Sequence, residues 1–96
     1  MTNDAYPPPP QYDHRPSIAI IEYFVKATEV GKAWCGKPMP GKAPFGCAQV
    51  VMWDGKPLCR IWFLTPDGKY QWTSPTIEEV RRHEHGHCNG WAPDHK

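Results

Sequence analysis

The segment from Thr76 to Trp91 constrains the fold of this chain most, because it carries the signals of both ends and one face of a helix. Thr76 and Glu79 have the spacing of a capping box, and Pro75 suits a helix entrance. Gly90 is a natural stop. We therefore predict a helix here. Its inward face begins apolar and becomes polar, with Ile77, Val80, Glu84, His87 and Trp91 at helical spacing.

Two histidines on the predicted helix have the spacing of metal ligands. His83 and His87 belong to the run His83-Glu84-His85-Gly86-His87. Because a helix turns once in about 3.6 residues, both imidazoles fall on one face. His-Glu-x-x-His on a helix is a zinc-binding pattern, and Glu84 beside the first ligand can reach a metal-bound water. His85 falls off the ligand face and is expected to face solvent. The competing interpretation is a polar, histidine-rich helix without a metal.

A third ligand is expected after the helix, where Gly90 lets the chain turn back. A catalytic zinc site takes three protein ligands and leaves one position for water. Asp94 and His95 are the remaining residues that ligate well. His95 lies far enough beyond His87 to fold back over the metal, and Asp94 is the runner-up.

The segment resembles the zinc motif of zincin-type metallopeptidases. The similar residues are His83-Glu84-His85-Gly86-His87, Gly90-Trp91 and His95. The chain departs from the metzincin pattern, which would place its third histidine at Pro93 and which has a later methionine turn. It is more similar to small bacterial and phage metallopeptidase-like proteins. The resemblance implies a reduced zincin-like scaffold with Zn²⁺ held by His83, His87 and His95, and Glu84 as general base.

These residues predict a zinc-dependent peptide hydrolase that uses a metal-activated water, with Glu84 as the catalytic residue. The alternative is a non-catalytic binding module of a phage or mobile element with a structural zinc. Four protein ligands, the fourth being Asp94 or Cys88, would favour that module. Either function implies a peptide or protein as substrate or partner. In zincins an edge strand near the helix holds the substrate backbone, and the strand containing Cys59 to Phe63 is our candidate.

The rest of the chain predicts an α+β fold with a small, mostly antiparallel sheet. Residues 1–16 are proline-rich and predict a disordered arm, and residues 17–96 form the metal-binding domain. Residues 17–26 predict a buried strand, and residues 28–35 a short helix. Residues 47–53 and 58–64 predict a hairpin around Asp54-Gly55, and residues 70–73 a further short strand. Three tryptophans are expected to pack on the sheet faces: Trp53, Trp62 and Trp72.

The composition limits the partners. The chain has 96 residues and a formal net charge of +1, which gives no general electrostatic footprint for nucleic acid. No apolar run is long enough to span a bilayer, so neither a nucleic-acid nor a membrane partner is expected. The first 16 residues lack the features of a signal peptide. We therefore expect a cytoplasmic location unless a leader has been removed.

The four cysteines lack Cys-x-x-Cys spacing, which argues against a thiolate zinc ribbon. Since the helix must pack its inner face on the sheet, we expect Cys88 to pair with Cys59, leaving Cys35 to pair with Cys47. Four reduced, buried thiols are the alternative, and the missing signal peptide supports it.

Overall fold

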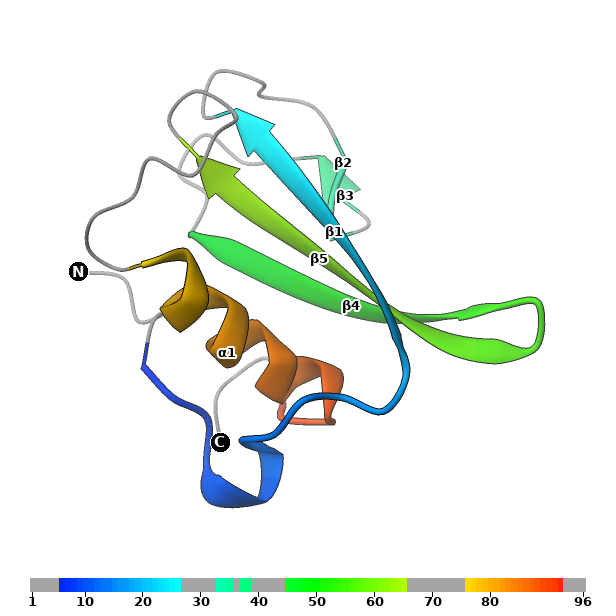
Figure 1. The fold of residues 1–96 in the computed structure, drawn as a ribbon. Coiled ribbons are helices and arrows are strands. Elements are labelled where there is room, and N and C mark those ends of the chain that lie inside the picture. Colours follow the sequence, from blue (N-terminus) through cyan, green and yellow to red (C-terminus); the bar gives the residue numbers. More distant parts are fainter. Residues whose placement is uncertain (1–5, 27–32, 36, 39–44, 66–75, 93–96) are drawn as a thin grey trace.

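The computed structural model describes residues 6–26, 33–35, 37–38, 45–65 and 76–92. These residues form a three-stranded mixed sheet followed by one helix, α1 (Ile77–Cys88), which lies against one face of the sheet (Figure 1). The sheet contains β1 (Ala19–Lys26), β4 (Gly46–Trp53) and β5 (Lys56–Thr65) in the order β1-β5-β4. The predicted α+β class is confirmed.

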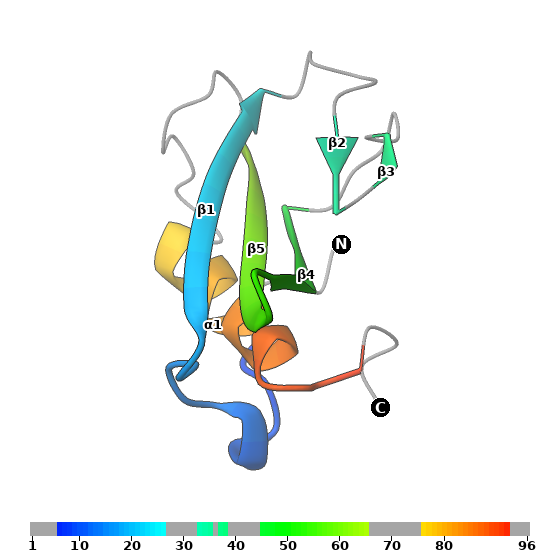
Figure 2. The same cartoon turned by 90° about the vertical axis from the view of Figure 1, so that its right-hand side faces the viewer.

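The expectation of a mostly antiparallel sheet is only half right. β4 is antiparallel to β5, but β1 runs parallel to β5, with Ala19 opposite Leu58 and Lys26 opposite Thr65. The two strands lie side by side in Figure 2. A parallel pair requires a long crossover, which here includes β4 itself together with β2 (Ala33–Trp34) and β3 (Lys37–Pro38).

The predicted hairpin is confirmed as β4 and β5. Its turn is shorter than expected and consists of Asp54 and Gly55 alone, at φ 53° and 76°. Positive φ at both central residues matches the right-handed twist of the strands, and Asp-Gly adopts it readily. Lys56 and Pro57 already belong to β5.

β5 divides the interior into two layers because successive side chains point to opposite faces. Cys59, Ile61 and Phe63 are fully buried and pack against Val80 and Cys88 of α1. On the other face, Trp62 packs with Val25 and Trp34. α1 and Trp34 of β2 therefore cover opposite faces of the sheet.

Two local predictions were wrong. Ala33 and Trp34 form β2 rather than the end of a helix, and the rest of that predicted helix lies outside the described residues. Trp34 is buried in the second layer, where tertiary packing overrides the weak helix signal.

Trp53 stands at the hairpin end and is 72% exposed, whereas Trp62 packs on the sheet as expected. Trp72 and the strand predicted over residues 70–73 lie outside the described residues.

The helix ends were predicted correctly. Thr76 is the N-cap of α1, and its side chain and that of Glu79 form the reciprocal capping box. Asn89 is the C-cap, and Gly90 follows it at φ 105°, a conformation that favours glycine. Within the described part of the chain, α1 included, no helix is long and apolar enough to cross a membrane.

Both predicted disulfides are present. Cys59 is bonded to Cys88 with a Cα–Cα distance of 5.7 Å, and Cys35 to Cys47 with 6.1 Å. Such bonds persist in oxidising compartments, so they favour one over the cytoplasmic location expected from the sequence.

Candidate metal centre

His83 and His87 direct their Nε2 atoms at each other across one turn of α1. The two nitrogens are 3.3 Å apart. The Nδ1 atom of His83 lies 2.8 Å from the Tyr6 carbonyl oxygen, and Nδ1 of His87 lies 2.9 Å from the Trp91 carbonyl oxygen. A carbonyl oxygen only accepts hydrogen bonds, so both Nδ1 atoms must donate. When both rings are neutral, their Nε2 lone pairs therefore face the same space.

The paired nitrogens fit a zinc ion. Two lone pairs facing each other repel unless a proton or a cation lies between them. Zinc binds imidazole nitrogen at about 2.0–2.1 Å, so two ligands in tetrahedral geometry are separated by roughly 3.3–3.4 Å. The observed Nε2–Nε2 separation of 3.3 Å falls in this range. Hydrogen bonding of Nδ1 to a carbonyl is also the usual way in which a ligating histidine is oriented.

Two aromatic side chains hold the histidine rings in place. Trp91 stacks on His87 with ring centroids 4.7 Å apart and an interplanar angle of 8°. The Tyr6 ring meets His83 edge-on at 5.0 Å and Trp91 at 5.8 Å. His83 is only 1% exposed. Trp91 was expected on the histidine face of the helix. Tyr6 was not expected there, because no sequence signal connects Tyr6 to His83, which lies far along the chain.

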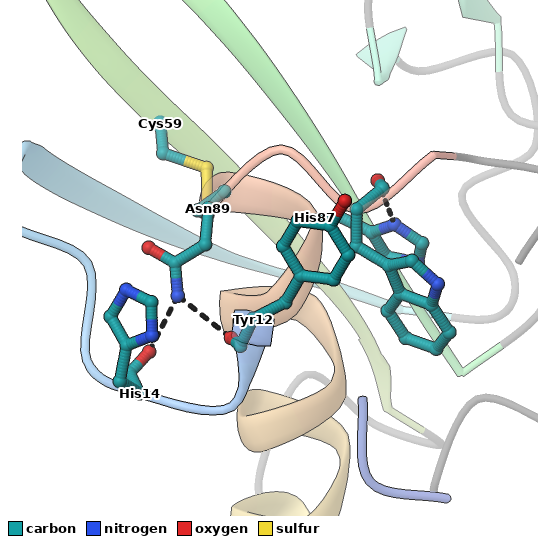
Figure 3. The surroundings of a disulfide bond; sticks show 7 residues. Tyr12, His14, Cys59, His87 and Asn89 are labelled. Atoms are coloured by element: carbon teal, nitrogen blue, oxygen red, sulfur yellow. Dashed lines mark hydrogen bonds between the residues drawn. A yellow bond between two sulfur atoms is a disulfide. The ribbon is translucent and has the colours of Figure 1, made fainter. Parts of the chain in front are cut away.

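Residues 6–14, which we call the strap, lie along α1. The sequence predicted a disordered arm here, yet the strap contains a 3₁₀ turn (Pro10–Tyr12) and is anchored to the helix. The Asn89 side-chain amide donates to the carbonyl oxygens of Tyr12 at 2.8 Å and His14 at 2.7 Å (Figure 3). Arg82 pairs with Asp13, which lowers the pKa of that carboxyl group. Asn89 thus gives two backbone oxygens of this proline-rich segment a partner, and Arg82 adds an ion pair.

Glu84 is buried at 2% exposure and lies on the side of α1 that faces the start of β4. A Cβ atom built on Gly46 would lie 3.2 Å from Oε2 of Glu84 and 2.8 Å from Cγ1 of Val80. Gly46 therefore leaves room for the carboxylate next to the strand.

The edge strand was predicted wrongly. Cys59 to Phe63 belong to β5, which is the central strand and pairs on both sides. β4 is an edge strand of the three-stranded sheet, and it is the one that Glu84 approaches. The error arose because the parallel partner β1 could not be recognised from local sequence.

The structure brings together two of the three predicted ligands. No group of three or more metal-ligating side chains occurs among the residues that the structure describes. His95 and the runner-up Asp94 lie outside that part of the chain. Cys88 was considered as a fourth ligand, but its sulfur is bonded to Cys59 and provides no thiolate.

His85 lies away from the histidine pair, as predicted, but it is partly buried rather than facing solvent. It lines a cavity together with Arg15, Glu22 and Arg81. Burial lowers the pKa of His85, and the nearby Glu22 carboxylate partly opposes this shift.

No family model, curated protein or solved structure matches the chain. The residues of the site are therefore the basis on which its function is inferred.

Proposed function

We propose that the protein is a zinc-dependent peptide hydrolase on a reduced zincin-like scaffold, with His83 and His87 as two of its ligands. The observation that carries this proposal is the pair of Nε2 atoms 3.3 Å apart, each on a ring whose Nδ1 proton is committed to a backbone carbonyl. We assign the third ligand to His95 from the resemblance to zincins.

The protein residues divide the chemistry between them. When bound, zinc would supply Lewis-acid activation of a water molecule and of a substrate carbonyl. Glu84 acts as general base, takes a proton from the attacking water and passes it to the leaving amine. β4 lies at the edge of the sheet beside Glu84, so it can align an extended peptide through backbone hydrogen bonds.

A structural zinc in a non-catalytic binding module is the second candidate. The near-complete burial of His83 and the edge-on contact of Tyr6 with its ring favour this function, because a catalytic metal needs access for substrate. The loss of Cys88 as a ligand weighs against a closed four-ligand site and leaves Asp94 as the fourth candidate.

Glu84→Gln separates the two functions. We expect the zinc-loaded variant to keep its fold and its zinc but to lose about 10²–10⁴-fold in peptide hydrolysis, the usual worth of a general base. The matched control is Glu78→Gln, which neutralises an exposed carboxylate on the same helix and should leave hydrolysis unchanged. If zinc-loaded wild type cleaves no member of a broad peptide library, the structural module replaces the hydrolase.

A further inference from the structure

Gly86 lies where the strap comes closest to α1. A Cβ atom built on Gly86 would lie 2.5 Å from Cβ and 2.8 Å from Cγ of Pro8. Contacts this short do not occur between real side chains, so Pro8 occupies the space that any other residue at position 86 would fill. Glycine is unfavourable inside a helix compared with alanine. The close approach of Pro8 gives a physical reason for glycine between His85 and His87.

The contact at Pro8 positions the backbone two residues earlier. Tyr6 carries the carbonyl oxygen that accepts the hydrogen bond from Nδ1 of His83 at 2.8 Å. His87 is oriented differently, by the Trp91 carbonyl only four residues along its own chain segment. One histidine of the pair thus depends on the strap, and the other on the residues that follow α1.

We propose that the strap is an integral part of the metal centre and that Tyr6 is a positioning residue. Its backbone carbonyl keeps His83 in the Nδ1-protonated tautomer, which leaves Nε2 available to the metal. Pro8, seated on Gly86, keeps that carbonyl in place. This role of the strap rests on the proposed zinc binding.

The other anchors of the strap act farther along it. Asn89 holds the carbonyl oxygens of Tyr12 and His14, and Arg82 holds Asp13. A disturbance confined to Pro8 should therefore displace Tyr6 while the later residues of the strap remain attached to α1.

Gly86→Ala tests the inference in the full-length protein. The added methyl group must displace Pro8, whereas alanine itself favours the helix. We expect zinc affinity, measured by competition with a chromophoric chelator, to fall by about 10- to 100-fold, as is typical when the partner of a ligating histidine is lost. In zinc-free protein at fixed pH, ¹⁵N NMR of the imidazoles should show His83 leaving the pure Nδ1-protonated form.

Pro8→Gly in the Gly86→Ala background is the matched rescue. It removes both proline atoms that clash, so affinity should return to that of the Pro8→Gly single variant. The Cβ atom that Gly86→Ala adds would also lie 3.0 Å from Cε3 of Trp91. Pro8→Gly does not relieve that contact, so rescue assigns the effect to the strap rather than to Trp91.

Zinc affinity of Gly86→Ala within twofold of wild type, with the His83 tautomer unchanged, would overturn the inference and leave the proposed function intact. Should the variant not fold, the wild-type spectrum decides, because an Nε2-protonated His83 contradicts the role of Tyr6. Wild type that takes up no zinc would instead overturn the proposed function.

Discussion

Cys59, in the central strand β5, is covalently bonded to Cys88, which directly follows His87 on α1. The bond fixes the last turn of the helix to the sheet next to a proposed ligand. Cys59 is fully buried and Cys88 is 7% exposed, so both lie in the layer between α1 and β5. The disulfide therefore restrains the position of His87 as well as the fold.

We expect the double variant Cys59→Ala/Cys88→Ala to lose stability and zinc affinity together. The native Cys59–Cys88 bond spans a sequence separation of 29 residues. From the chain entropy of such a loop, its removal should lower the free energy of unfolding by about 3.6 kcal/mol. Cys35→Ala/Cys47→Ala is the control, with a separation of 12 residues and an expected loss of about 2.9 kcal/mol.

The control bond lies on the sheet face away from α1, so its removal should leave zinc affinity unchanged. Denaturant unfolding and zinc titration measure the two effects. Equal zinc affinity in both double variants would contradict the restraint on His87. Peptide mass mapping of the purified protein under non-reducing conditions should recover the same two pairs.

Substitution of the histidines should separate ligands from neighbours. His83→Ala and His87→Ala should each abolish uptake of one equivalent of zinc, because each removes one of the two converging Nε2 atoms. His85→Ala is the control, since it removes an imidazole from the same helix but away from the pair. Metal analysis of protein purified without chelator measures the outcome, and retention of zinc by His83→Ala/His87→Ala would exclude this site.

Removal of zinc should lower the melting temperature. A ligand that binds only the folded state at 100 times its Kd stabilises by about 2.7 kcal/mol. For a domain of this size, the Tm shifts by about 4–8 °C for each kcal/mol of change in the free energy of unfolding. Chelation should therefore lower the Tm by roughly 10–20 °C. The His83→Ala/His87→Ala variant should not respond to the chelator. An unchanged wild-type melting curve after verified zinc removal would contradict the prediction.

Local signals in the sequence predicted most of the regular structure. Thr76 and Glu79 predicted the start of α1, and Asp54-Gly55 predicted the hairpin. Both patterns could be recognised because they act over a few residues. The Cys59–Cys88 pairing followed from the need to pack the helix on the sheet.

Features that depend on distant partners were not predictable. The parallel alignment of β1 with β5 is decided by packing on both faces, not by the composition of either strand. The partner of His83 is a backbone carbonyl, and every residue carries one, so Tyr6 had no distinguishing mark. The helix was expected over residues 28–35. At Ala33 and Trp34 the structure has β2 instead, because Trp34 gains more from burial than a short helix offers.

The mixed sheet has a kinetic consequence. The β4–β5 ladder closes at Trp53 and Lys56, whereas the β1–β5 ladder joins Ala19 to Leu58. Closing a short loop costs less entropy than closing a long one, so the hairpin should form early and β1 should dock on it in the slower step. In pulse-labelled hydrogen exchange, backbone amides of β4 should gain protection before those of β1. Simultaneous protection of both strands would mean that folding is limited by a single concerted event.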